Sequence, residues 1–337
     1  MPSDLPGDLP NNRKTVVILG TGGTIAGTAA SATDNVGYVA AQRGVAELVA
    51  AVPALATGPI EAAQVAQLDS KDMDHATWQR LALAAQQHLA RPDVAGVVVT
   101  HGTDTLEETA YFLHHVLALD KPLVLTAAMR PATALGADGP QNLLDAVAVA
   151  RHPGARGVLA VLAGQVHAGL GLRKSHTYRL NAFDSGDSGP LAAVEEGALR
   201  VFRAWPEAMN QPGTALTRPP QDWPWVEVLS SHAGARPQGV AALVAAGVQG
   251  LVLATTGNGT VHQALVAALH DACAAGVRVW RSTRCAQGVV VGATTPTGGP
   301  GGVADPLPAV ALTPWQARVA LMLALMDEKR LAGAGKS

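Results

Sequence analysis

The stretch VVVTHGTDTLEETAYF, residues 97–112, runs from a continuous apolar segment through a turn of glycine, threonine and aspartate into a helix-like pattern. The stretch TVVILGTGGTIAG, residues 15–27, shows the same change from an apolar run to a turn of small residues. Such runs are typical of strands buried on both faces of a parallel sheet. Open α/β sheets bind ligands at the carboxyl ends of their strands. The hydroxyls of Thr24 and Thr103 at two such ends therefore indicate an enzyme rather than a scaffold.

Further apolar runs alternate with helix-like segments along the rest of the chain. They are PLVLTAA (122–128), GVLAVLA (157–163), VEVLSS (226–231), GLVLATT (250–256) and VRVWRST (277–283). Residues 206–225 interrupt this pattern, because they are rich in proline, tryptophan and polar residues and have no regular period. We predict an α/β fold with a larger N-terminal domain at 1–205, built on an open, mainly parallel sheet. We further predict a connecting segment at 206–225 and a smaller C-terminal α/β domain at 226–337.

The composition is that of a large globular protein without a strongly charged surface. The 337 residues are 48% hydrophobic, enough for two cores, and 24 basic residues face 26 acidic ones, so neither nucleic acid nor a membrane surface is an expected partner. Cys273 and Cys285 lack the spacing of a disulfide framework or zinc site, and we expect two reduced, half-buried thiols. The apolar run at 315–326 is too short to span a bilayer. The first 14 residues lack a secretory signal, which predicts a cytoplasmic protein if Met1 is the native start.

Two capping-box spacings predict where helices begin. Thr105 with Glu108 predicts a helix that starts just after Asp104. The segment TPWQ, residues 313–316, predicts the start of a last helix that runs to about Lys329.

The first of these helices leaves two polar side chains at its positive end. Thr103 and Asp104 are not needed for capping, and backbone N–H groups at a helix start favour a carboxylate or a developing oxyanion. His101 is a candidate general base, although a histidine satisfied by backbone is the more common case at a strand end. His114 and His115 are adjacent, so they face different sides of the helix and do not form a metal pair. We expect no metal and no cofactor.

Thr24 has two competing interpretations. A threonine after a strand is often a helix N-cap, whereas an exposed hydroxyl in a tight turn can be a nucleophile. The turn is followed by small and polar residues up to Tyr38, a composition that indicates a mobile lid. A third possibility is a nucleotide or small-ligand binding module, but Ile25 stands where a dinucleotide fingerprint has its third glycine.

Six segments together resemble the bacterial L-asparaginases, in particular the type II asparaginase and glutaminase-asparaginase group. They are TGGTIAG (21–27), DSKDM (69–73), THGTDTLEETAYFL (100–113), AAMRPATALGADGPQNL (127–143), RKSHT (173–177) and TTGNGTVHQAL (255–265). The match keeps its order from about residue 15 to 330, and TGGTI with HGTDT is specific to this group. The resemblance implies a cofactor-free hydrolase of asparagine catabolism that converts L-asparagine to L-aspartate and ammonia, with some activity on L-glutamine.

The resemblance also implies catalytic roles for five residues. Thr24 is the nucleophile that forms an acyl-enzyme, and Tyr38 is the tyrosine of the lid. Thr103, Asp104 and Lys174 match a second catalytic group, in which a partly desolvated lysine exchanges a proton with the neighbouring hydroxyl.

The implied binding site includes a residue from a neighbouring subunit. Ser70 and Asp104 hold the amino-acid end of the substrate, and Asn258 is contributed by another copy of the chain, which implies a homotetramer built as a dimer of dimers. The expected substrate-binding residues are Gly23, Ser70, Lys71, Gly102, Thr103, Asp104 and Asn258.

Two positions depart from the family pattern. Lys71 stands where the family has Gln or Glu near the substrate ammonium, so we expect it to point to solvent or to pair with Asp72 or Asp74, with weaker or altered substrate binding. The late segment 282–304 lacks the glutamate of type II members, and Asp305 is the first acid after it.

One alternative keeps the fold and changes the function. An asparaginase-like subunit of a tRNA amidotransferase releases ammonia for a partner, but the early first strand and the absence of a basic patch in the sequence weigh against it.

Overall fold

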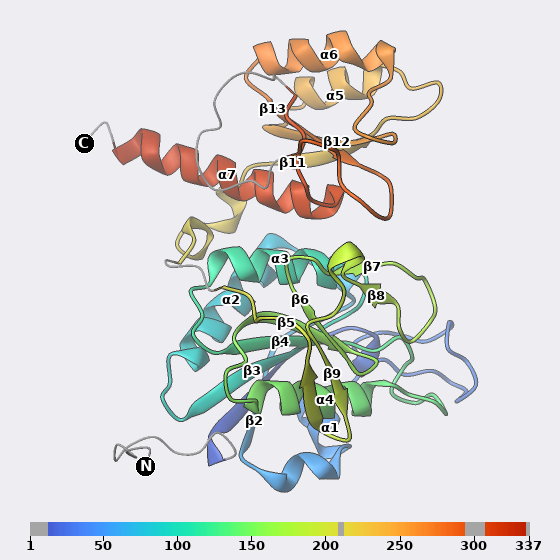
Figure 1. The fold of residues 1–337 in the computed structure, drawn as a ribbon, viewed down its shortest axis with the longest axis vertical. Coiled ribbons are helices and arrows are strands. Elements are labelled where there is room, and N and C mark those ends of the chain that lie inside the picture. The colour runs from blue at the N-terminus through green and yellow to red at the C-terminus, as the bar shows by residue number, and fades with distance from the viewer. Residues whose placement is uncertain (1–12, 208–211, 294–306, 335–337) are drawn as a thin grey trace. The chain divides into compact units, whose positions relative to one another are not determined.

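The computed structural model describes residues 13–207, 212–293 and 307–334, which form two compact units that divide between Gly213 and Thr214 (Figure 1). The first contains an eight-stranded sheet and the second a three-stranded sheet. This architecture confirms the predicted fold class, a large, mainly parallel sheet domain and a smaller α/β domain.

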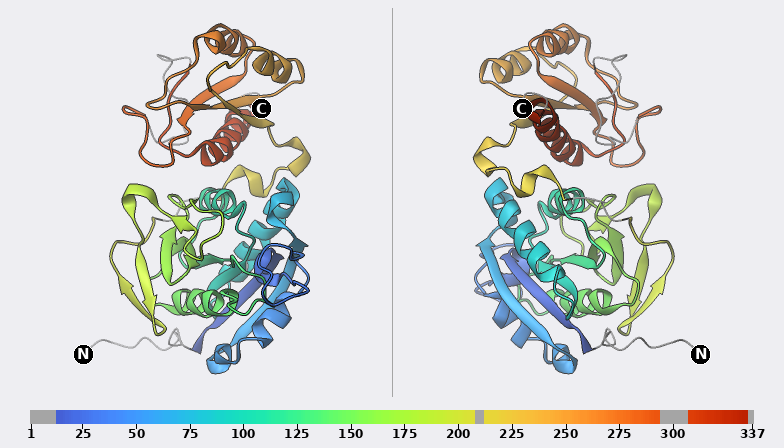
Figure 2. Two further views of the ribbon diagram at one scale, coloured as in Figure 1. Left: turned by 90° about the vertical axis from the view of Figure 1, so that its right-hand side faces the viewer. Right: turned by 90° about the vertical axis from the view of Figure 1, so that its left-hand side faces the viewer.

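The first unit is built on a mixed sheet, in which four of the five parallel strands match predicted apolar runs and the edge strand at 60–68 was not predicted. The sheet has the order β10-β9-β6-β5-β4-β3-β1-β2. Its strands are β1 (Thr15–Gly22), β2 (Ile60–Leu68), β3 (Val94–Thr100), β4 (Pro122–Thr126), β5 (Gly157–Leu162), β6 (Gln165–Ala168), β9 (Ala192–Glu195) and β10 (Ala198–Val201). Strands β2, β1, β3, β4 and β5 are parallel, whereas β6, β9 and β10 extend the sheet in antiparallel fashion. Figure 2 shows this antiparallel end, in yellow-green, opposite the blue strands at the other edge.

Helices cover both faces of this sheet. They are α1 (Val45–Ala50), α2 (His75–Leu89), α3 (Leu106–Val116) and α4 (Gly139–Arg151). Helices α2 and α3 lie on one face, where Trp78 stacks on Phe112, and α1 and α4 lie on the other (Figure 1). On the latter face, Val16 and Val98 of the sheet belong to the same buried cluster as Leu143 of α4. Burial of apolar side chains on both faces holds the strand ends in fixed positions.

Short elements connect these layers and carry several of the predicted site residues. They are the 3₁₀ helices η2 (Thr24–Ala26), η3 (Pro53–Thr57), η4 (Ser70–Asp72) and η5 (Gly186–Ser188), and the two-residue strands β7 (Arg173–Lys174) and β8 (Phe183–Asp184). Strands β7 and β8 pair with each other in an antiparallel two-stranded sheet.

The second unit has a small parallel sheet with helices on both faces. Its elements are η6 (Thr214–Leu216), η7 (Pro220–Asp222), β11 (Val226–Ser230), α5 (Gln238–Ala245), β12 (Gly250–Thr255), α6 (Gln263–Ala274), β13 (Arg278–Thr283) and α7 (Pro314–Ala334). Strand β12 pairs in parallel with β11 and β13. Helices α5 and α6 cover one face of this sheet and α7 covers the other (Figure 1).

The two predicted capping boxes have different outcomes. Helix α7 begins as predicted: the Thr313 hydroxyl accepts the Gln316 N–H at 3.2 Å, and Gln316 Oε1 accepts the Thr313 N–H at 3.4 Å. Helix α3 also begins where predicted, but its capping box is wrong. Thr105 occupies the N-cap position without a side-chain cap bond, and its hydroxyl donates to the carbonyl of Ser70 at 2.8 Å.

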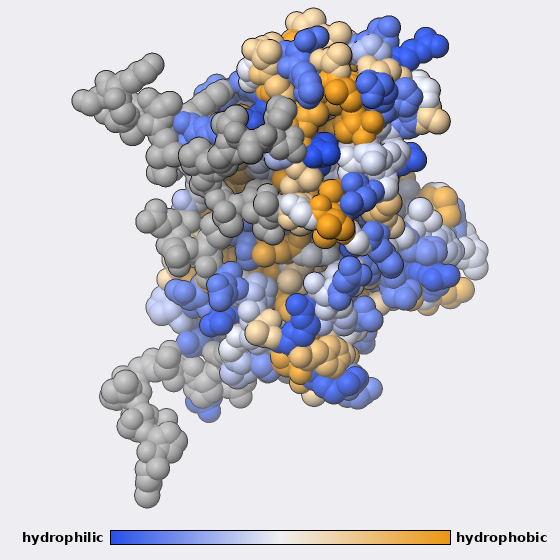
Figure 3. Space-filling model, turned by 45° about the horizontal axis from the view of Figure 1, so that its top comes forward, coloured by the Kyte–Doolittle hydropathy of each residue, from blue (hydrophilic) through white to orange (hydrophobic). Residues whose placement is uncertain are grey.

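The surface, the cysteines and the helices can be compared with what the composition predicted. On the face shown in Figure 3, hydrophilic and apolar residues are intermixed. Both cysteines are thiols outside any disulfide; Cys273 is half-buried, but Cys285 is exposed, so the expected burial of Cys285 was wrong. Within the part of the chain that the structure describes, no helix combines the length and apolarity needed to cross a bilayer.

Candidate active site

Thr24 lies in the turn that follows β1. Gly22 and Gly23 have φ values of 106° and 80°, a backbone conformation that side chains rarely adopt, so the two glycines make the sharp turn possible. Thr24 is the first residue of η2, whose N-cap is Gly23, without a side-chain cap bond. The N-cap interpretation of Thr24 therefore does not hold.

The Thr24 hydroxyl contacts Tyr38. Thr24 Oγ1 and the Tyr38 hydroxyl are 2.6 Å apart, and either atom can be the donor. Thr28 and Val39 form an isolated bridge that folds the segment between them back on itself. A Cβ at Gly27 would lie 2.9 Å from the Tyr38 ring, so Gly27 gives the ring room beside the turn. The structure thus brings together two side chains that the sequence places 14 residues apart.

Glycine contacts join this turn to the end of β3. A Cβ at Gly23 would overlap the backbone of Gly102, and a Cβ at Gly102 would overlap the side chain of Ser70. Strands β1 and β3 are neighbours in the sheet, so both turns lie at the same sheet edge. The backbones of Gly23 and Gly102 are therefore in close contact, and Thr24 and Thr103 are the residues that follow them.

The second predicted group is assembled around Lys174 of β7. Lys174 Nζ donates to Thr103 Oγ1 at 2.8 Å and to Asp104 Oδ1 at 2.6 Å. The Lys174 side chain is 20% exposed and that of Asp104 is 54% exposed. One ammonium therefore contacts a buried hydroxyl on one side and a solvent-facing carboxylate on the other.

Ser70 supports the same turn from η4. Its buried hydroxyl accepts the Asp104 N–H at 3.2 Å, and its carbonyl accepts the Thr105 hydroxyl. These two bonds hold the start of α3 against η4.

Lys71 points to solvent and also pairs with Asp72, one of the two acids that were expected as partners. The Lys71 side chain is 62% exposed, and its ammonium lies 2.5 Å from an Asp69 carboxylate oxygen and 3.7 Å from one of Asp72. The hydrogen bond to Asp69 raises the pKa of Lys71. Asp69 was not among the expected partners, and Asp74 instead caps α2 by accepting the Thr77 N–H at 2.7 Å.

His101 is a buried structural histidine, as the more common interpretation predicted. Its Nδ1 lies 2.7 Å from the Gly102 carbonyl, and its Nε2 lies 3.0 Å from Thr109 Oγ1, while the Trp78 indole N–H donates to the same hydroxyl oxygen. Because a carbonyl only accepts, Nδ1 carries the proton. Burial lowers the pKa of His101 to about 4, so the ring is neutral and supports the Gly102 turn.

Glu107 lies beside the predicted cluster, but it was not predicted as a site residue. It lies in the first turn of α3, is 6% exposed, and accepts the backbone N–H of Lys174 at 2.6 Å. Burial raises the pKa of its carboxyl to about 7. Helical spacing gives a signal for it, because Glu107 shares the face of Ala110 and Tyr111, which are both buried.

Two further predicted residues belong to the second unit or to the part of the chain that is not described. Asn258 follows β12 in the second unit, where its Oδ1 accepts the Val291 N–H at 2.7 Å. Asp305, the candidate for the missing late acid, lies outside the described residues. Among the residues that are described, no group of three or more His, Cys, Asp or Glu side chains could hold a metal ion.

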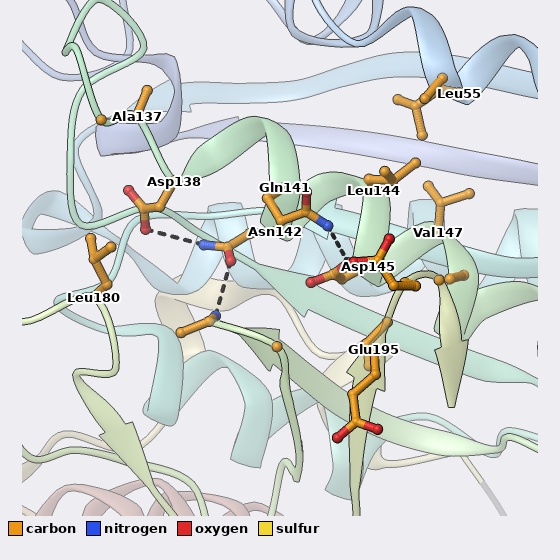
Figure 4. Close-up of a pocket in the computed structure, with 18 of the residues that line it drawn as sticks. Leu55, Ala137, Asp138, Gln141, Asn142, Leu144, Asp145, Val147, Leu180 and Glu195 are labelled. Atoms are coloured by element: carbon orange, nitrogen blue, oxygen red, sulfur yellow. Dashed lines mark hydrogen bonds between the residues drawn. The ribbon is translucent and has the colours of Figure 1, made fainter. Parts of the chain in front are cut away.

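A cavity of about 1090 Å³ lies elsewhere in the first unit, along α4 (Figure 4). Figure 4 shows Asn142 between Asp138 and the backbone of Ala163, and Gln141 donating to Asp145. Its lining contains neither Thr24 nor Lys174. The cavity is therefore separate from the hydroxyl and ammonium cluster.

The fold and the site define a two-domain α/β protein with two hydroxyl groups, one paired with a phenol and one with an ammonium, at the carboxyl edge of the larger sheet. Residues 15–207 match the family model "Asparaginase, N-terminal", and residues 225–333 match "Glutaminase/Asparaginase C-terminal domain". The chain belongs to the asparaginase family, which confirms the resemblance seen in the sequence.

Individual relatives cover nearly the whole chain. A glutaminase-asparaginase of Pseudomonas fluorescens biotype A is 37% identical over 322 residues, which are 94% of this chain and 88% of that protein. A probable periplasmic L-asparaginase of Haemophilus influenzae is 37% identical over 327 residues, 96% of this chain and 90% of its own. The crystal structure of a probable cytoplasmic L-asparaginase from Campylobacter jejuni superposes with a TM-score of 0.85 at 34% identity, covering 94% of this chain and 98% of that one.

Proposed function

We propose that this protein is an amidohydrolase that converts L-asparagine and water to L-aspartate and ammonia, with L-glutamine as a second substrate. Relatives of the same family are named L-asparaginase and glutaminase-asparaginase. The proposal rests on one observation: two turns contact each other where Gly23 packs against Gly102. One turn carries Thr24, which contacts Tyr38, and the other carries Thr103 and Asp104, which contact Lys174.

In the first half of the reaction, Thr24 Oγ1 attacks the side-chain amide carbon of the substrate. The Tyr38 hydroxyl is 2.6 Å from Oγ1 and can relay the proton, because it accepts the Thr24 proton while it passes its own phenolic proton to the departing nitrogen. Backbone N–H groups near Thr103 stabilise the negative charge on the former carbonyl oxygen. The C–N bond then breaks, the nitrogen leaves as ammonia with the transferred proton, and an ester to Thr24 remains.

In the second half, water attacks the ester carbon and releases L-aspartate. The Thr103 hydroxyl can accept the proton of the attacking water while it passes its own proton back to Thr24 Oγ1, and the Lys174 ammonium orients it by donating to Thr103 Oγ1 at 2.8 Å. Asp104 orients the ammonium through its 2.6 Å contact with Nζ. Atoms balance, because the amide loses its nitrogen as ammonia and gains the oxygen of water.

Substrate binding uses the exposed side of the same cluster. The half-exposed Asp104 carboxylate pairs with the substrate α-ammonium, and Ser70 holds the turn that carries it. Gly23, Gly102 and Thr103 complete the proposed binding site, where the lack of a side chain at the two glycines lets their backbones and Ser70 pack closely together. Lys71 follows Ser70 in η4, where its exposed ammonium pairs with Asp69.

Assembly, domain bounds and compartment belong to the same proposal. We expect a homotetramer in which Asn258 of one copy completes the site of another, and a connection between the domains at 206–225. The division after Gly213 supports the domain bounds. A cytoplasmic location is supported by the name of the Campylobacter jejuni protein. Light scattering, with the KM of Asn258→Ala measured beside it, tests the assembly.

The direct test of the proposed function is ammonia release from L-asparagine, L-glutamine and D-asparagine. Thr24→Ala should lower kcat on L-asparagine by roughly 10³-fold or more, because it removes the nucleophile. Thr33→Ala is a matched control, since Thr33 is an exposed threonine of the same segment whose hydroxyl contacts Ser31. Wild-type turnover by Thr24→Ala, with no loss in folding, contradicts the assignment.

A further inference from the structure

The main chain of Lys174 is held by a buried carboxylate that the mechanism above does not use. Glu107 Oε2 accepts the Lys174 backbone N–H at 2.6 Å, and the Glu107 side chain is 6% exposed. Glu107 therefore contacts the backbone of Lys174 and not its side-chain ammonium.

The strand that carries Lys174 has little support of its own. Strand β7 has two residues, and it pairs with the two-residue strand β8. The N–H of Ser175, the residue after β7, bonds at 2.8 Å to the carbonyl of Ala182, the residue before β8. Since successive N–H groups of a strand point to opposite sides, the Lys174 N–H points away from β8 and toward α3. Glu107 thus occupies the free edge of a very short ladder.

Among the described residues, one continuous segment, from Thr103 to Glu107, provides the hydrogen-bond partners of Lys174 outside its own ladder. Thr103 and Asp104 contact Nζ, and Glu107, one helical turn later, contacts the backbone N–H. The start of α3 therefore holds Lys174 both at its backbone N–H and at its side-chain ammonium.

The hydrogen bond survives a change in the charge of Glu107. Burial raises its pKa to about 7, while the Lys174 N–H and the Arg173 guanidinium lower it, and Glu108 and Asp184 raise it. A protonated carboxyl keeps a carbonyl oxygen that accepts an N–H. The contact with Lys174 therefore depends on an acceptor at this position and not on a full negative charge.

We propose that Glu107 is a positioning residue, which fixes β7 against α3 and so holds the Lys174 ammonium on Thr103 and Asp104. This inference rests on the proposed function, since it assigns Glu107 a role in the reaction performed by that site. A lysine side chain has many rotamers, and catalysis is sensitive to misplacement on the scale of 1 Å.

The test compares two substitutions at Glu107 with a matched buried carboxylate. Glu107→Ala removes the acceptor and should lower kcat at least about tenfold while changing KM by less than about threefold. Glu107→Gln keeps an acceptor oxygen in the same place and should stay within about threefold of the wild-type kcat. Asp145→Asn is the control, because Asp145 is also a buried carboxylate, accepts a bond from Gln141 and lies on α4 away from the cluster. All variants are assayed well below their melting temperatures.

A double variant separates this inference from the proposed function. If Glu107 acts through Lys174, Glu107→Ala combined with Lys174→Met should have a kcat no lower than Lys174→Met alone. Additive losses, a wild-type kcat in Glu107→Ala, or an equal loss in Glu107→Gln overturns the positioning role. Low activity of Lys174→Met beside normal activity of Glu107→Ala refutes only this inference. Normal activity of Lys174→Met refutes the catalytic role of Lys174, and the positioning role with it.

Discussion

Acidification should destabilise the first unit through its buried histidines. Burial lowers the pKa of His101, His114, His115 and His167 to about 4 each, below the usual value of about 6.5. Each neutral ring therefore contributes stability that is present above about pH 6.5 and is lost as the pH falls toward 4. Glu107 has the opposite sign, because its raised pKa makes the folded state bind a proton more tightly than the unfolded state.

The size of the effect follows from these pKa values. Between about pH 7.5 and about pH 5.5, each histidine loses roughly 1.3 kcal/mol, so the four lose about 5 kcal/mol together. Over the same interval Glu107 takes up its proton in the folded state and offsets about 2 kcal/mol. The free energy of unfolding should therefore fall by about 3 kcal/mol in the wild type. In Glu107→Gln the offset is absent, and the fall should be about 5 kcal/mol.

Urea unfolding at several pH values, followed by far-UV circular dichroism, measures this difference. His167→Gln provides an independent check, since it removes one titrating group and should make the fall about 1.3 kcal/mol smaller. The comparison uses the pH dependence within each variant, so a constant loss of stability from either substitution cancels. A wild-type fall below about 1 kcal/mol, or a smaller fall in Glu107→Gln than in the wild type, would refute the reasoning.

Three further substitutions test contacts of the candidate site. Tyr38→Phe removes the hydroxyl beside Thr24 and should lower kcat by roughly 10²-fold with an unchanged circular dichroism spectrum; normal kinetics would exclude a role in proton transfer. Lys71→Gln removes an exposed cation, so the melting temperature should change by less than about 2 °C while KM for L-asparagine falls a few-fold, and a higher KM would show that Lys71 aids binding. Gly23→Ala introduces a Cβ that overlaps the backbone of Gly102 at a φ of 80°, and should cost at least about 2 kcal/mol of stability together with activity; a stable, active variant would show that the turns can separate.

Four of the five parallel strands of the larger sheet could be predicted because their signal is local, whereas the partly exposed edge strand β2 lacks a continuous apolar run and was not predicted. Residues 15–20, 96–100, 122–128 and 157–163 are continuous apolar runs, and each forms a strand that is buried on both faces. The end of each run also places the following polar residue at the sheet edge. Thr24 and Thr103 were therefore identified as site candidates from the pattern alone.

The position of Lys174 could not be predicted in this way. Strand β7 has two residues, which is too short for any period, and Lys174 is 70 positions from Asp104. Only the match of RKSHT to a family motif pointed to it. Glu107 was missed for a related reason: its carboxylate acts on a backbone N–H 67 positions away, and no local rule describes that contact.

Thr105 and Thr313 show why local rules fail near the site. Both threonines occupy the first position of a capping box before a helix, yet only the Thr313 hydroxyl accepts the expected backbone N–H. Thr105 instead donates its hydroxyl proton to the carbonyl of Ser70, which lies 35 positions earlier. A cap of this kind is worth about 1 kcal/mol, similar to the net value of another hydrogen bond, so a tertiary partner at the right distance can replace it. Here the replacement ties α3 to η4, and with it Thr103, Asp104 and Glu107, so the lost cap helps to hold together the group that binds Lys174.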